Sequence, residues 1–288
     1  MTLVEHRRVA AGGRQGPLVT QSISRSGHPP AGTSLGRILL GAALMFAVLQ
    51  VGLTVLVPSL GMTWTPVVVT LAMFALLFVI ERVAFGRNPL AALAAVGFGR
   101  PTRGSLVVAA IVGGGMLLFF PLYSAATGVS FALKADWLGL LVGSIALNGL
   151  AEETLFRGFV FGHLRQAGHS FRRAALISLL VFGAIHLVLF ASNPFVIAFL
   201  ATILALAAAF PYAFLYERAG RTIWAGAIVH VAGHAVRFVD MPEAQVLVVS
   251  SIWTVALFGG VFLVLAFRNN LLRAPATERP LPAPATAT

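Results

Sequence analysis

Apolar stretches of about twenty residues recur along most of this chain, separated by short polar breaks. A helix needs roughly this many apolar residues to cross the bilayer core, which is about 30 Å thick. Eight such segments run roughly over 38–57, 66–85, 105–125, 137–162, 174–191, 195–216, 222–239 and 246–267. The short alternating strands typical of a transmembrane barrel do not occur in the pattern. The sequence predicts an all-α fold, a polytopic membrane bundle of about eight transmembrane helices.

The composition changes at both ends of the chain. Residues 1–36 are polar and basic and contain no apolar run, so we expect a disordered N-terminal tail and no cleaved signal peptide. Residues 269–288 are rich in proline and alanine and are expected to form a disordered C-terminal tail. Between the tails we expect an N-terminal three-helix part at 37–136, a core at 137–240 and a last transmembrane helix at 241–268.

The placement of arginine gives the bundle an orientation. The net charge is +11, and every basic residue except Lys134 is arginine. With the N-terminus in the cytoplasm, all basic residues except Lys134, Arg157 and Arg237 fall on the cytoplasmic side. This distribution obeys the positive-inside rule and predicts that both termini are cytoplasmic. It indicates contact with the lipid bilayer and no nucleic-acid partner. Because the chain has no cysteine, disulfides, thiolate metal sites and a cysteine nucleophile are excluded.

A small group of ionisable side chains lies inside the predicted segments, where each charge costs at least ~2.5–3.5 kcal/mol. From the helical rise, Glu152 lies roughly 16 Å from the cytoplasmic end of its segment and His186 roughly 20 Å. The same estimate gives roughly 12 Å for His230 and roughly 18 Å for His234. Because three helices bring titratable groups to similar depth, we expect these groups to share one cavity. The group comprises Glu152, Glu153, Arg157, His186, His230 and His234.

Helix periodicity separates the two adjacent glutamates. Glu153 and Arg157 are spaced i,i+4, which favours an ion pair that keeps the carboxylate charged. That pair can serve structure alone or take part in chemistry directly. Glu152 points about 100° away and has no neutralising partner nearby in the sequence. It is therefore the candidate base for activating water, with His186 holding the water or relaying a proton.

The two histidines of the seventh segment are also spaced i,i+4. His230 and His234 therefore line one face of a helix that is rich in small residues such as Gly226. As neutral imidazoles they are candidate donors to the oxyanion of a tetrahedral intermediate. We expect the remaining histidines to be solvated, namely His6, His28, His163 and His169.

These residues resemble the motifs of the CAAX protease and bacteriocin-processing family, also called CPBP or Abi, which includes the type II CAAX prenyl endopeptidases. The first family motif, Glu-Glu-x-x-x-Arg, is matched by Glu152–Arg157. The second, Phe-x-x-x-His, is matched by Phe182–His186. The third, His-x-x-x-Asn or Asp, is matched at His230 but has His234 in its last position. The resemblance covers roughly residues 137–240, and the eight-helix layout is also similar.

The resemblance implies a peptidase, an intramembrane endopeptidase in which Glu152 and His186 activate the attacking water. His230 and His234 would then supply the oxyanion hole, and the ion pair of the first motif would support the site. The implied partner is a peptide or membrane-protein substrate, which we expect to reach the cavity from the cytoplasmic leaflet. Similarity to the bacterial members implies an integral protein of the inner membrane.

Three alternatives remain open. No cofactor is favoured, but Glu152, His186, His230 and His234 have the composition of a zinc site, so a zinc-dependent version of the protease is possible. The His-Glu-x-x-His arrangement is missing. A membrane transporter would also place such residues at mid-membrane, although the sequence shows no inverted repeat. A non-proteolytic scaffold is suggested by the departure at His234.

Overall fold

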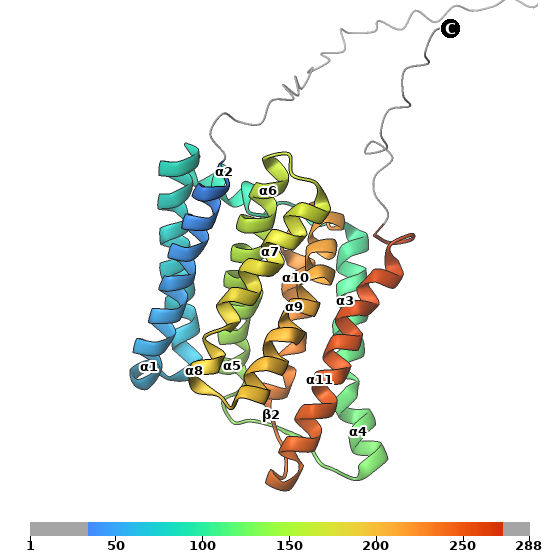
Figure 1. Cartoon of the computed structure of the whole chain (residues 1–288). Helices are drawn as coiled ribbons and strands as arrows, with labels where there is room; N and C mark the ends of the chain where they lie inside the picture. Colours follow the sequence, from blue (N-terminus) through green and yellow to red (C-terminus); the bar gives the residue numbers. More distant parts are fainter. Residues whose placement is uncertain (1–33, 273–288) are drawn as a thin grey trace, which may run out of the picture.

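The computed structural model describes residues 34–272 as a bundle of helices (Figure 1). Six helices in this range are long and apolar enough to cross a membrane. The predicted all-α membrane bundle is therefore confirmed. Most of the two predicted tails, residues 1–33 and 273–288, lies outside the described residues. The six helices are Leu35–Phe85, Arg103–Thr127, Trp137–Gln166, Phe171–Ala191, Phe195–Arg218 and Glu243–Phe267.

The first two predicted segments form one bent element, α1 (Leu35–Phe85). The bend lies at Gly61, whose φ of 68° and ψ of 178° belong to a backbone region that favours glycine. The two halves fold back and lie side by side (Figure 1). At Gly52 they pack so closely that a Cβ atom would lie 2.6 Å from Cγ2 of Val69. The helix begins inside the predicted N-terminal tail because Ser34 caps it by accepting a hydrogen bond from the Arg37 amide.

The chain then crosses the arginine-rich end through α2 (Pro89–Ala95) and descends through α3 (Arg103–Leu117) and α4 (Phe119–Thr127). Asn88 and Thr102 cap α2 and α3 with their side-chain oxygens. Next comes the short strand β1 (Ala132–Leu133), which pairs antiparallel with β2 (Val239–Asp240). This two-stranded sheet ties the loop after α4 to the segment that follows α10.

The fourth membrane helix is continuous but changes type along its length. It comprises α5 (Trp137–Ser144), the π-helical η1 (Ile145–Glu152) and η2 (Thr154–Phe161), and α6 (Gly162–Gln166). Runs of π-helix are rare and occur often at functional sites. Here Glu152 is the last residue of η1, and Glu153 lies between the two π-helical runs.

The remaining chain forms α7 (Phe171–His186), α8 (Leu189–Ser192), α9 (Phe195–Arg218), α10 (Trp224–Gly233), η3 (Ala235–Phe238), η4 (Glu243–Gln245), α11 (Val246–Leu263) and η5 (Val264–Phe267). Of these, α10 has only ten residues and is too short to cross a bilayer. The six long helices contain seven of the eight predicted segments, because the first two segments are the two antiparallel halves of α1. The remaining segment, 222–239, contains the short helix α10.

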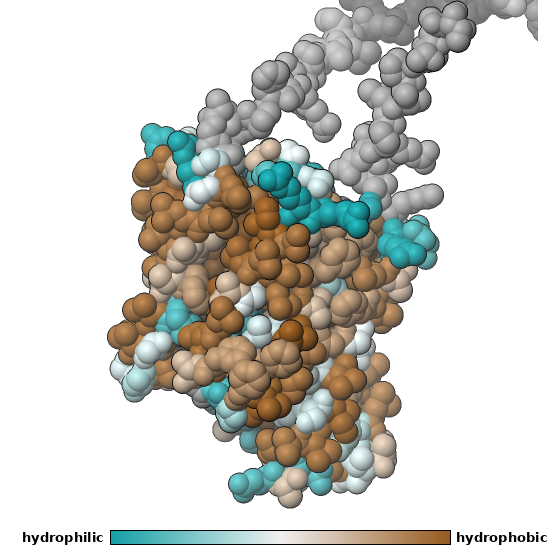
Figure 2. Space-filling view, viewed as in Figure 1, coloured by the Kyte–Doolittle hydropathy of each residue, from teal (hydrophilic) through white to brown (hydrophobic). Residues whose placement is uncertain are grey.

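The described surface has an apolar belt between two hydrophilic ends (Figure 2). Many large apolar side chains are exposed, including Leu40, Val55 and Leu71 of α1. Leu272 is fully buried within the cluster formed with α3, α9 and α11, although we expected residues 269–288 to form a disordered tail. That expectation was wrong for its first residues, because the chain after α11 packs closely against Gly104 at the start of α3.

Candidate functional site

The buried ion pair at the centre of the bundle joins Glu153 and Arg157. Nη1 of Arg157 lies 3.2 Å from Oε1 of Glu153, and the two side chains are only 2% and 1% exposed. The guanidinium carbon lies 4.9 Å from the centre of the Phe182 ring and 4.6 Å from that of the Tyr212 ring. The i,i+4 pair expected from the sequence is present, and two aromatic rings hold its cation.

Glu153 has a second partner on α10. Nδ1 of His230 lies 2.9 Å from Oε1 of Glu153. The other carboxylate oxygen fits against Gly226, where a Cβ atom would lie 2.6 Å from Oε2. The lack of a side chain at Gly226 thus lets α10 approach the carboxylate. Glu153 is therefore enclosed by a guanidinium, an imidazole and a helix backbone.

Glu152 has a different environment from its neighbour. Its side chain is 21% exposed. Oε1 accepts a hydrogen bond of 2.9 Å from the Asn148 amide, whose oxygen accepts one of 3.1 Å from Ser144. The Asn148 amide, one turn earlier on the same face, is thus a local hydrogen-bond partner of Glu152 that does not neutralise its charge. Its Oε2 lies 3.7 Å from Nε2 of His230, too far for a direct hydrogen bond.

His186, on α7, has one ring nitrogen committed and one available. Nδ1 lies 2.7 Å from the carbonyl oxygen of Phe182. Because a carbonyl oxygen only accepts, Nδ1 carries the proton, and Nε2 of the neutral ring has a free lone pair. His186 thus presents a proton acceptor to its surroundings.

Two cavities meet at Glu152 and His186. The first has a volume of about 470 Å³ and is also lined by Tyr212, His230 and His234. The second, of about 340 Å³, lies toward the first half of α1. Glu152, His186, His230 and His234 therefore share a cavity, as expected from their matched depths. Glu153 and Arg157 line neither cavity and are buried in the bundle.

The end of α10 places two imidazoles in contact. The His230 and His234 rings stack with their centres 5.3 Å apart and their planes at 25°. His234 follows the last helical residue of α10 and has non-helical φ and ψ of −94° and 7°. Because Nδ1 of His230 donates to Glu153, a neutral His230 has no N–H left for an oxyanion. His234 is free of that restriction.

The cavity lies in the half of the bundle remote from the arginine-rich end. Its lining residues on α7 begin at Phe182, near the end of the helix, while those on α9 run from Ala201 to Tyr212, before Arg218. On the segment that follows α10 the cavity continues to Arg237, which also lines the second cavity. The cavity therefore lies away from the arginine-rich end, and the expected access of substrate from the cytoplasmic leaflet stays a prediction.

A second polar cluster, which sequence reasoning missed, lies at the arginine-rich end. His163 was expected to be solvated but is fully buried. Its Nε2 lies 2.9 Å from Oε1 of Glu81 and 2.7 Å from Nη1 of Arg87. The cause is that the fourth membrane helix continues through α6 and packs under the end of α1. His169 is half-buried, and His6 and His28 lie outside the described residues.

A metal site needs several ligand side chains that converge on one point. Within residues 34–272, no group of three His, Asp or Glu side chains is arranged to hold a metal ion. The four side chains that suggested a zinc site, Glu152, His186, His230 and His234, thus do not converge on one point in the described part of the chain. Zinc dependence stays an open alternative, and the chemical roles of the individual side chains stay predictions.

Comparison with known proteins gives one match. Residues 134–236 match the family model described as Type II CAAX prenyl endopeptidase Rce1-like. The matched segment contains both glutamates, Arg157 and the three histidines of the cavity. No curated protein and no solved structure matches the chain.

Proposed function

We propose that this chain, which belongs to the CAAX protease family through residues 134–236, is an intramembrane endopeptidase that activates water with Glu152 and His186. One observation carries the proposal. Both side chains line the same two cavities, and the bond from Nδ1 of His186 to the Phe182 carbonyl leaves Nε2 free to accept a proton. A carboxylate and an imidazole acceptor on one cavity can together orient and deprotonate water.

In the first step, water held between Glu152 and His186 attacks the carbonyl carbon of the scissile peptide bond. Glu152 takes the proton from water as the new carbon–oxygen bond forms. The hydrogen bond from Asn148 fixes the Glu152 carboxylate, so its second oxygen stays directed toward the cavity. The product of this step is a tetrahedral intermediate with a negatively charged oxygen.

His234 is the proposed donor to that oxyanion. Its ring lines the cavity, and no bond to Glu153 consumes its N–H. His230 donates from Nε2 only when the ring is protonated, so its first role is to hold Glu153. One positioned donor of this kind is worth about 10²–10³ in rate.

In the second step the intermediate collapses. The carbon–nitrogen bond breaks, and the proton held by Glu152 passes to the leaving nitrogen. The products are a new carboxylic acid and a new amine, which becomes an ammonium group when the acid passes its proton to it, and Glu152 returns to its starting charge. The Glu153–Arg157 pair holds η2 in place beneath the site without taking up a proton.

The substrate is proposed to be a peptide or a membrane-protein segment that enters the cavity from the half of the bundle remote from the arginines. The cavity of about 470 Å³ is large enough for a few residues of an extended chain. With the predicted topology, this is the non-cytoplasmic half of an inner membrane.

The test is cleavage of a quenched fluorescent peptide library by the purified full chain in lipid nanodiscs. We expect Glu152→Gln and His186→Ala to lower kcat/KM by at least about 10²-fold, the usual contribution of a general base. Glu243→Gln and His169→Ala are matched controls, because both residues lie outside the cavities.

Cleavage by Glu152→Gln at the wild-type rate would overturn the mechanism. Loss of cleavage on chelation, restored by zinc, would replace it with the zinc-dependent version. Wild-type protein that cleaves nothing in the library, yet is folded, would favour the transporter or scaffold alternatives.

A further inference from the structure

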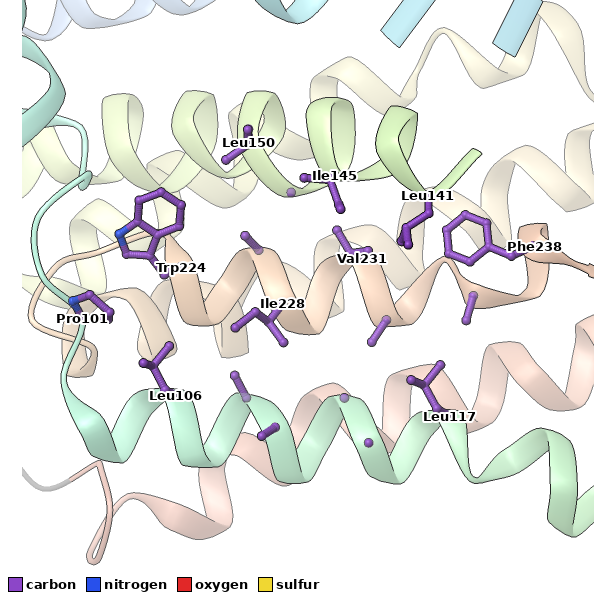
Figure 3. A pocket seen from close by; sticks show the side chains of 18 of the residues that line it. Pro101, Leu106, Leu117, Leu141, Ile145, Leu150, Trp224, Ile228, Val231 and Phe238 are labelled. Atoms are coloured by element: carbon purple, nitrogen blue, oxygen red, sulfur yellow. The ribbon is translucent and has the colours of Figure 1, made fainter. Parts of the chain in front are cut away.

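A second large hollow lies on the opposite side of α10 from the proposed catalytic cavity. It has a volume of about 820 Å³ and lies between α3, α10 and the helix formed by α5 and η1 (Figure 3). We call it the α3–α10 groove. Its lining consists entirely of apolar and glycine residues, including Leu106, Gly114, Ile145, Ile228 and Val231. No side chain in it can activate a substrate or bind a metal.

The groove faces the bilayer. Leu106, Leu117 and Ile228 line it and are 37%, 46% and 44% exposed. It is hollow because α3 and α10 present small residues to each other. At Gly114 a Cβ atom would meet nothing within 4 Å.

The length of the groove matches one leaflet. Trp224 and Pro101 lie at one end and Phe238 and Leu141 at the other (Figure 3). The α10 path from Trp224 to Ala235 is about 16 Å long at the helical rise. This is close to half of the bilayer core of about 30 Å. An acyl chain from the arginine-side leaflet therefore fits along it.

The charge at the open end favours an anionic headgroup. Arg100 precedes Pro101, and Arg103 lies one turn before Leu106 on α3. Both arginines are exposed, and neither forms an ion pair with any residue that the structure describes. Adjacent unpaired arginines at a membrane surface attract the phosphate of anionic lipids.

We propose that the α3–α10 groove binds one anionic phospholipid, with its phosphate at Arg100 and Arg103 and an acyl chain along α10. The bound acyl chain fills the space on the side of η1 and α10 that faces away from the catalytic cavity. Gly149 on η1 and Val231 on α10 line the groove, while their neighbours Asn148 and His230 line the catalytic cavity. The lipid thus supports the contact between η1 and α10.

The experiment measures phospholipid retained by the purified full chain, using intact-protein mass spectrometry from detergent with added phosphatidylglycerol or phosphatidylcholine. Gly114→Leu fills the groove from α3. Gly115→Leu is the matched control, because its Cβ also meets nothing within 4 Å but the residue does not line the groove. The double variant Arg100→Gln, Arg103→Gln tests the headgroup.

We expect wild type and Gly115→Leu to retain one phosphatidylglycerol. Retention by Gly114→Leu falls at least about tenfold, the effect of excluding two methylene groups from an apolar site. The double arginine variant loses the preference for phosphatidylglycerol over phosphatidylcholine. If Gly114→Leu fails to fold, Ala110→Leu fills the groove from the next turn of α3.

Equal retention by Gly114→Leu and Gly115→Leu would overturn the proposal, as would equal retention of both lipids by wild type. A Gly114→Leu protein that keeps the lipid but no longer cleaves lipid-tailed peptides would assign the groove to a substrate tail instead. Because lipid retention is measured without any cleavage, failure of the proposed protease function leaves this test intact.

Discussion

Nδ1 of His230 lies 2.9 Å from Oε1 of Glu153, so the first histidine of the third motif is bonded to the second glutamate of the first motif. The same carboxylate oxygen is 3.2 Å from Arg157. A single oxygen atom thus links η1–η2 to α10. The two glutamates differ because this linkage occupies Glu153 and leaves Glu152 in the cavity.

Removing the charge of Glu153 should destabilise the protein. Glu153→Gln leaves Arg157 buried without a counter-charge, and we expect the free energy of unfolding to fall by about 3–5 kcal/mol. Glu152→Gln, at a partly exposed site, should unfold close to wild type. Denaturant unfolding in detergent, followed by circular dichroism, measures both. Equal stability of the two variants would contradict the different environments of the glutamates.

Adding one methyl group at Gly226 should displace the Glu153 carboxylate. In Gly226→Ala the new Cβ would lie 2.6 Å from Oε2, closer than van der Waals contact allows. Overpacking of this kind costs about 1–3 kcal/mol, and the shift of His230 should lower the cleavage rate as well. Gly259→Ala, where a Cβ meets nothing within 4 Å, is the control. Wild-type activity of Gly226→Ala would show that the carboxylate position is not critical.

The ring of Tyr212 should matter more than its hydroxyl group. Tyr212→Phe keeps the ring 4.6 Å from the Arg157 guanidinium carbon, whereas Tyr212→Leu removes it. We expect the leucine variant to lose at least about 2 kcal/mol, combining a desolvated cation–π contact with lost packing. Thermal unfolding of the two variants gives the comparison. Equal losses in both would assign the effect to the hydroxyl group.

The side from which the cavity is reached can be tested by labelling, because the chain contains no cysteine. Arg237 lines both cavities and is exposed, while Arg172 is exposed at the start of α7. We expect an impermeant maleimide to label Arg237→Cys in intact cells, and Arg172→Cys only after permeabilisation. The reverse result would place the cavity on the cytoplasmic side and invert the predicted topology.

Periodicity and spacing were sufficient to predict the all-α bundle and to predict that Glu152 and His186 lie at a similar depth in it. They also predicted the Glu153–Arg157 pair, since i,i+4 neighbours remain close where the helix becomes π-helical. The bond between Glu153 and His230 could not be predicted, because it depends on how closely α10 approaches η1. That approach is set by packing between distant segments.

The errors have a common cause. His163 was expected to be solvated because it follows the predicted segment 137–162, yet α6 extends the helix and buries the ring against Glu81. Tyr212 was missed because an aromatic residue in an apolar segment carries no local signal. Its contact with Arg157 exists only when α9 and η2 are packed together.

The early end of α10 has a consequence for permeability. The ten residues of α10 span about 15 Å, half of the bilayer core, and the chain continues as the short 3₁₀ helix η3, whose Arg237 lines the cavity. Backbone that departs from the α-helix at membrane depth is tolerated where it lines a cavity. Toward the arginine-rich end, Phe156, Phe159 and Phe161 are at most 1% exposed and close the bundle. The cavity is therefore closed by packed aromatic side chains toward the arginine-rich end. A hydrolase needs water from one face only, whereas a carrier must open to both faces. We therefore expect vesicles that contain this protein to hold a proton gradient as well as vesicles without it.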